Sequence, residues 1–339
     1  MKDNKFKDLL NIARKIGGKP EYFQGGGGNI SVKFRDSNEM RIKASGYRIS
    51  DMSIDSGFVS VNCVLLKNFF KKVSKKSGDY EKESLELTTK SILSLDKSKK
   101  PSIETGFHTL LGDFVIHSHS VYANILSCSK DFDNLAKELF GKIKSTVDVI
   151  DYAAPGYHLT LNVNKVVKNN HSEDRIIFMK NHGVIVSASS ASKAVALHEK
   201  VSKIIKSHFK IKTSYPIPKI KKISENHFVS NSKFLLNFLK THNNYFLKIK
   251  SHLLFPDLVV FCNNTSNKKG KIKVDTKNNS IIYLTNEKEA RTIEENLLSW
   301  AYILSNLEKN NLKPNFLTKK DADFILNMDS EKYRKKLLK

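Results

Sequence analysis

The stretch I-H-S-H-S, residues 116–120, places two histidines two positions apart at the end of an apolar run. Alternate side chains of a β-strand point to the same face, so a strand here would project His117 and His119 side by side. His182, in the stretch N-H-G of residues 181–183, would supply a third imidazole. Three histidine nitrogens with an open fourth position are typical of a catalytic zinc site. The histidines therefore predict a site for Zn²⁺ or another divalent metal.

A carboxylate precedes the histidine pair, in the stretch P-S-I-E-T-G-F-H at residues 101–108. Glu104 could ligate the metal or transfer protons beside it. The structural alternative is an acidic residue that the helix dipole favours at the start of a helix. His108, one helical turn after Glu104, is a candidate to support the site. We interpret the histidines outside these stretches as structural.

Short strands and helices alternate over residues 1–213, which indicates an α/β fold with a mixed β-sheet flanked by helices. Apolar periodicity predicts strands at residues 30–34, 40–44, 58–61, 115–119, 175–180 and 184–186. It predicts helices at residues 6–16, 64–73, 81–95, 105–111, 122–128, 132–143 and 191–209. We assign residues 1–213 to a catalytic domain because they contain every candidate site residue.

The stretch S-Y-P-I-P-K, residues 214–219, interrupts regular structure and marks the expected domain boundary. Residues 219–339 are expected to form a smaller α+β accessory domain. Its predicted strands cover residues 258–262, 271–274 and 281–284, and its predicted helices cover 287–307, 319–326 and 330–338. No residue cluster in this half suggests chemistry, which leaves packing, assembly or substrate restriction as its role.

Composition narrows the class of protein. The chain has 339 residues and three widely spaced cysteines, and no apolar run approaches the roughly 18 residues of a membrane span. These features and the polar N-terminus predict a cytoplasmic protein without a membrane partner. The formal charge is +24, but only seven of the 58 basic residues are arginine. Scattered lysines argue against a nucleic-acid partner, although a positive surface favours encounter with anionic substrates.

Five stretches in order resemble the class II aldolase/adducin family over about residues 6–209: G-G-G-G-N-I-S-V-K, K-A-S-G-Y, P-S-I-E, H-S-H-S and K-N-H-G. The chain looks most similar to the long branch that includes the aldolase part of rhamnulose-phosphate aldolase–dehydrogenase fusions. The stretches F-P-D-L-V-V-F-C and E-K-Y-R beyond the core support that placement. The resemblance implies the class II aldolase fold and a cyclic homotetramer.

The resemblance also implies roles for individual residues. His117, His119 and His182 match the zinc ligands, and Glu104 matches the catalytic carboxylate that can also ligate the metal. The positions that match a substrate-phosphate site are Gly28, Asn29, Ser45, Gly46 and Ser102. Ile103 stands where fuculose-phosphate aldolases have a second serine. Tyr122 and Tyr152 are candidates for a tyrosine proton donor.

The function predicted from these residues is a zinc-dependent aldolase that cleaves a ketose phosphate to an enediolate and an aldehyde. Two alternatives use the same metal site, namely a sugar-phosphate 4-epimerase and a dehydratase. A third alternative is a non-enzymatic, adducin-like interaction module, which would not need the three histidines and the glutamate.

Overall fold

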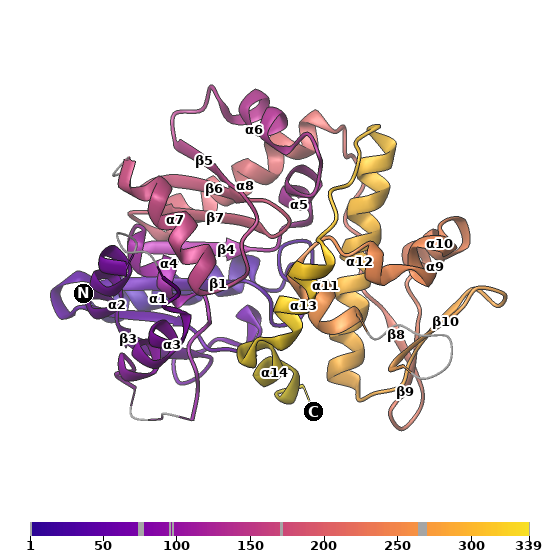
Figure 1. Cartoon of the computed structure of the whole chain (residues 1–339), viewed down its shortest axis with the longest axis horizontal. Helices are drawn as coiled ribbons and strands as arrows, with labels where there is room; N and C mark the ends of the chain where they lie inside the picture. Colours follow the sequence, from indigo (N-terminus) through magenta and orange to yellow (C-terminus); the bar gives the residue numbers. More distant parts are fainter. Residues whose placement is uncertain are drawn as a thin grey trace.

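The computed structural model describes residues 2–73, 78–94, 96, 98–169, 172–263 and 270–338. The N-terminal part forms a sheet covered by helices, and the C-terminal part adds a second sheet and further helices (Figure 1). In Figure 1 the long helix α12 (Glu287–Lys309) lies between the second sheet, which has α9 and α10 on its side, and the helices α11, α13 and α14. Within the described residues, no helix has the length and apolar character needed to cross a membrane.

The N-terminal sheet has seven strands in the order β3-β2-β1-β4-β7-β6-β5. All neighbouring pairs are antiparallel except β5 and β6, which are parallel. The strands are β1 (Asn29–Phe34), β2 (Glu39–Lys43), β3 (Phe58–Asn62), β4 (Phe114–Ser118), β5 (Thr146–Ile150), β6 (Arg175–Met179) and β7 (Gly183–Ala188). The predicted mixed sheet is therefore confirmed, and the structure adds β5 to the expected strands.

Helices cover both faces of the sheet because its central strands are apolar on both sides. Ile116 of β4 packs in one buried cluster with residues of α1 (Lys2–Ile16), α5 (Val121–Ser127) and α8 (Ala191–His208). Val115 packs in a second cluster with α4 (Thr105–Leu110) and α7 (Tyr157–Asn169). The alternation of β4 side chains thus places His117 on the α4 side, in ring contact with Phe107.

The other helices of this part are α2 (Cys63–Val73), α3 (Glu81–Lys90) and α6 (Phe132–Phe140). Helix α3 is shorter than the helix predicted for residues 81–95, and residue 95 lies outside the described residues. The helix at α7 was not predicted.

The C-terminal part contains a four-stranded antiparallel sheet in the order β10-β11-β9-β8. Its elements are β8 (Ile220–Ser224), β9 (His227–Ser230), α9 (Lys233–Thr241), α10 (Asn243–Leu247), α11 (Pro256–Cys262), β10 (Ile272–Asp275), β11 (Ser280–Tyr283), α12, α13 (Lys319–Asn327) and α14 (Asp329–Lys336). The predicted α+β composition is confirmed, including the three final helices.

The strand predicted for residues 258–262 is wrong, because this stretch forms helix α11. A short apolar run does not distinguish a buried strand from a buried helix. Pro256 at the first helical positions and Asp257 in the first turn favour a helix start. All seven residues of α11 are buried, so no amphipathic period marks the helix in the sequence.

One buried cluster runs through both parts of the chain. It joins Phe6 and Ile116 of the N-terminal part to Leu258 and Trp300 of the C-terminal part, and all four residues are 0% exposed. The division of the chain at residues 213–219 remains a prediction about how the parts fold.

Candidate active site

Three histidine rings meet at one end of β4. His117 belongs to β4, His119 follows it, and His182 occupies the turn between β6 and β7. Their ring centroids lie 4.9–5.1 Å apart, and the Nε2 atoms of His117 and His119 are 3.2 Å apart. All three side chains are buried. The predicted histidine cluster therefore exists in the structure.

The turn that presents His182 requires a glycine at its end. Ser118 of β4 pairs with Val184 of β7, so the β6–β7 turn lies directly beside the end of β4. Gly183 has φ +150°, and a Cβ there would overlap the carbonyl oxygen of Ser118. The glycine thus permits the close approach that brings His182 beside His119.

Glu104 lies beside two of the rings. Its Oε2 atom is 3.3 Å from His117 Nε2, and its Oε1 atom is 3.3 Å from His182 Nε2. Burial opposes ionisation of this carboxyl group, but His117 and His182 lower its pKa well below the usual value. Glu104 is therefore an anion next to the histidine nitrogens, where it could serve as a fourth ligand or as a base.

The residues present fit a divalent metal ion. One atom from each histidine can be chosen so that all three lie within 4.8 Å of one another. Outer contacts orient two of the rings: His117 Nδ1 is 3.3 Å from the carbonyl oxygen of Val184, and His119 Nδ1 is 3.0 Å from Asp257 Oδ2. His182 Nδ1 is buried without a hydrogen-bond partner among the described residues. Burial lowers the pKa of His119 to about 4, so this ring is neutral and able to ligate near pH 7.

A hydrogen-bond network of buried side chains fixes the position of Glu104. Asn29 Nδ2 donates to Glu104 Oε2 at 2.7 Å and to Ser102 Oγ at 3.0 Å. Because its amide nitrogen is the donor in these bonds, Asn29 Oδ1 accepts from His108 Nε2–H. His108 Nδ1 then accepts from the hydroxyl of Ser31 at 2.7 Å. His108 thus occupies the supporting position considered from the sequence, and its pKa is lowered well below the usual value by burial.

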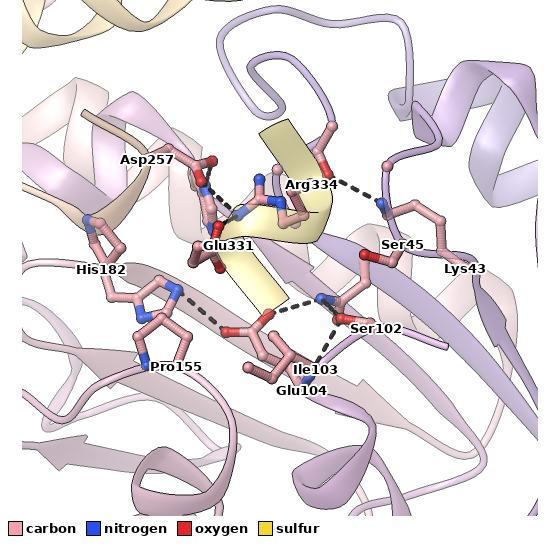
Figure 2. Close-up of a pocket in the computed structure, with 17 residues that line it drawn as sticks. Lys43, Ser45, Ser102, Ile103, Glu104, Pro155, His182, Asp257, Glu331 and Arg334 are labelled. Carbon is pink, nitrogen blue, oxygen red and sulfur yellow. Dashed lines mark hydrogen bonds and ion pairs between the residues drawn. The ribbon is translucent and has the colours of Figure 1, made fainter. Parts of the chain in front are cut away.

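A pocket opens beside Glu104 and the histidines (Figure 2). It is lined by the expected substrate-site residues Gly28, Asn29, Ser45, Gly46 and Ser102, together with Glu104, His119 and His182. The structure therefore brings together the residues that were named from separate stretches of sequence. Tyr122 and Tyr152, the candidate proton donors, are not among the residues that line this pocket.

The family model described as Class II Aldolase and Adducin N-terminal domain matches residues 7–209. The chain belongs to this family. The matched region contains all three histidines, Glu104 and the expected phosphate-binding residues. The family assignment made from the sequence is thereby confirmed, whereas the placement in a long branch remains a prediction. No curated protein matches the chain.

The chain is similar to several solved structures. The N-terminal class II aldolase domain of a conserved protein from Thermoplasma acidophilum is 22% identical with a TM-score of 0.50, and the match covers 59% of this chain and 92% of that one. An L-fuculose 1-phosphate aldolase is 21% identical, with a TM-score of 0.40 and coverage of 62% and 87%. A sugar-phosphate aldolase from Thermotoga maritima is 15% identical, with a TM-score of 0.44 and coverage of 63% and 98%. At 22% identity and a TM-score of 0.50, the likeness to the Thermoplasma acidophilum domain shows the fold alone.

Four pocket residues lie outside the region that matches the class II aldolase family, namely Pro256, Asp257, Glu331 and Arg334. Asp257 comes from α11, and Glu331 and Arg334 come from α14. Arg334 Nη1 is 2.9 Å from Asp257 Oδ1 and 2.9 Å from Glu331 Oε2. Burial would raise the pKa of Asp257, but Arg334 and His119 hold it below the usual range.

Sequence reasoning missed the three charged residues among them, Asp257, Glu331 and Arg334. The available signals were weak: one carboxylate inside the apolar stretch F-P-D-L-V-V-F-C, and a glutamate three residues before an arginine in E-K-Y-R. Such a pair is common on solvated helices. Its burial in a pocket depends on long-range packing.

Proposed function

We propose that this chain is a metal-dependent class II aldolase that uses zinc and cleaves a ketose phosphate. The observation that carries the proposal is the buried cluster of His117, His119 and His182 with Glu104 at the wall of a pocket. Family membership supports it, because class II aldolases are metal-dependent enzymes. An adducin-like interaction module would have no need to bury four such groups together.

When bound, a divalent cation supplies Lewis acidity that stabilises negative charge on the substrate oxygens. The rings of His117, His119 and His182 would hold it. Glu104 is placed to give a proton to, or take one from, the carbon released when the carbon–carbon bond breaks. Asn29 fixes the direction of Glu104 Oε2 through a hydrogen bond of 2.7 Å. The carboxylate is therefore aimed before the substrate arrives, which lowers the reorganisation needed during the reaction.

The same proposal places the substrate phosphate against Gly28, Asn29, Ser45, Gly46 and Ser102. Backbone N–H groups of a glycine-rich loop and short polar side chains are suitable donors to an anion. We also propose that the protein works in the cytoplasm as a homo-oligomer, a tetramer by resemblance to its family.

The test begins with the metal content of the purified protein and of two variants. We expect about one zinc per chain in the wild type and in the control His227→Ala, which changes a histidine on β9. His119→Ala should lose the metal because one of three nitrogen ligands is gone. Absence of stoichiometric metal after zinc is supplied would contradict the proposal and favour an interaction module.

Activity then separates the reactions that one metal site could support. The wild type is incubated with a set of ketose phosphates, and the products are analysed. Release of a triose phosphate and an aldehyde is the expected result. An isomeric ketose phosphate would indicate an epimerase instead, and loss of water would indicate a dehydratase.

A further inference from the structure

Helix α14 places an arginine in the pocket from a part of the chain outside the family match. Figure 2 shows α14 crossing the pocket, with Glu331 and Arg334 on the side that faces Asp257. Arg334 Nη1 contacts both Asp257 and Glu331, and its guanidinium carbon lies 5.4 Å from the centroid of the Phe261 ring. These contacts fix the plane of the guanidinium group.

One nitrogen of this fixed group has no hydrogen-bond partner within the described part of the chain. Arg334 Nη2 is buried and makes no hydrogen bond to any of the described residues. Buried donors in folded proteins are normally satisfied, so an orphan guanidinium nitrogen that lines a pocket indicates a missing acceptor. Guanidinium N–H groups donate strong, charge-assisted hydrogen bonds to oxyanions such as phosphate and carboxylate.

Lys43 also lines the pocket, but its ammonium group is already engaged. Lys43 Nζ donates to the carbonyl oxygens of Tyr47 at 2.7 Å, Gly26 at 3.0 Å and Ala44 at 3.4 Å. An ammonium group has three hydrogens, so these bonds leave none for a ligand. Lys43 therefore joins the glycine loop to the turn around Gly46, and Arg334 has the donor that is available to an anion.

The end of α14 also lies against the wall of the pocket. Leu337 lies directly against Gly46, where an added Cβ would overlap Leu337 Cδ1. The cavity measures about 30 Å³, which is room for about one water molecule. Arg334 belongs to the helix that narrows this space, so it lies where a ligand in the pocket would meet it.

We infer that Arg334 is a specificity-determining residue that binds the anionic group of the substrate, a phosphate or a carboxylate. The inference deepens the proposed function, on which it rests, by adding a residue of the C-terminal half to the N-terminal residues proposed to recognise that group. Asp257 then links the proposed metal site to the proposed anion site, because its Oδ2 atom contacts His119 and its Oδ1 atom contacts Arg334.

Titration calorimetry on the purified full-length protein tests the inference, with inorganic phosphate and acetate as separate probes. We expect wild-type protein to bind one of the two anions. Arg334→Lys keeps a cation that can pair with Asp257 or Glu331 but removes the free second nitrogen. Because a hydrogen bond to a charged group is strong, this variant should bind the anion about 10-fold to 100-fold more weakly. Thermal unfolding and metal content, measured alongside, should stay close to wild type.

Glu331→Gln is the matched control on the same helix. It keeps a side-chain oxygen for Arg334 and removes a negative charge, so anion affinity should be retained or increased. Equal losses in Glu331→Gln and Arg334→Lys would overturn the inference, because they would indicate a general effect of α14. Unchanged affinity in Arg334→Lys, or no binding of either anion to the wild type, would also overturn it.

The outcomes separate this inference from the proposed function. Cleavage of ketose phosphates by a protein whose phosphate affinity does not depend on Arg334 would refute the inference alone. Arg334-dependent binding of acetate without phosphate would support the inference and direct the substrate search to sugar acids. Arg334-dependent phosphate binding without cleavage of any ketose phosphate would support the inference while the aldolase proposal fails.

Discussion

Replacement of Asp257 by asparagine tests whether the C-terminal half supports the metal site. Asp257 is 1% exposed, and its two oxygens contact His119 Nδ1 at 3.0 Å and Arg334 Nη1 at 2.9 Å. A carboxylate on the outer nitrogen of a metal-binding histidine fixes the ring orientation and increases the basicity of the inner nitrogen. Asparagine has nearly the same shape as aspartate but no charge. The variant therefore removes mainly the electrostatic contribution of Asp257 to its contacts with His119 and Arg334.

The expected loss of metal affinity follows from this contact. Removal of such an outer partner typically weakens metal binding by about 10-fold to 100-fold, or about 1.4–2.7 kcal/mol. Stability should also fall, because breaking a buried ion pair costs about 3–5 kcal/mol when one partner is left without compensation. Arg334 keeps its contact with Glu331, so we expect a loss near or below about 3 kcal/mol.

The assay is a competition titration in which the protein and a coloured chelator share Zn²⁺, with urea unfolding as the stability measurement. Asp113→Asn is the control, because Asp113 is also a mostly buried carboxylate with two cationic partners, Lys5 at 2.9 Å and Arg35 at 2.7 Å. The control should lose stability and keep its zinc affinity. Unchanged zinc affinity in Asp257→Asn, with the protein folded, would refute the reasoning.

Three further predictions concern the rest of the molecule. Burial lowers the pKa of Lys33 to about 7, so between pH 7 and 10 the unfolded chain binds one more proton than the folded chain. Each such lysine makes the unfolding free energy rise with pH by up to about 1.4 kcal/mol per unit, and burial lowers the pKa of Lys43 to about 7 as well. In urea titrations Lys33→Met should therefore reduce the slope without abolishing it, and the exposed control Lys203→Met should retain the full slope. Gly46→Ala should lower the unfolding free energy by about 1–3 kcal/mol, because φ is +79° at this position and the new Cβ meets Leu337. Thermal unfolding should show a smaller loss of stability when the same substitution is made in a Leu337→Ala background. Trp300, the single tryptophan, lies in the cluster that spans both halves, so its fluorescence and the far-UV circular dichroism should change at the same urea concentration; two separate transitions would instead indicate independent domains.

The central part of the fold could be predicted because local signals agreed with one another. Successive side chains in the apolar run before His117 point to opposite faces of the sheet, where each face is covered by helices. The glycine after His182 marks a sharp turn. Helix α11 could not be predicted in the same way, since a run that is buried on every side has no period. There, the deciding features are Pro256 at the start and the surrounding core.

The predicted site was incomplete for a related reason. His117, His119, His182 and Glu104 come from stretches whose spacing and composition are unusual, so they are visible in the sequence. The local sequence around Asp257 and Arg334 contains no motif that indicates a site. Only the packing of their helices places the two side chains in the pocket. A buried carboxylate within an apolar stretch is the one local signal that could have indicated Asp257, because such a group is costly unless paired.

The contacts around the site explain how two parts of the chain can form one pocket. Glu295 of α12 accepts from the backbone N–H of Gly25 and pairs with Arg48 at 3.0 Å, which fixes the glycine loop. Asn181, beside His182, donates to the carbonyl oxygens of Leu254 at 2.8 Å and Asn315 at 2.7 Å. Loss of any of these bonds would leave polar groups that the fold has already withdrawn from water, at about 1–3 kcal/mol each. Displacement of Glu295 would therefore disturb the glycine loop, and displacement of Leu254 or Asn315 would disturb the His182 turn. The C-terminal half thus supports the geometry of the site at two places.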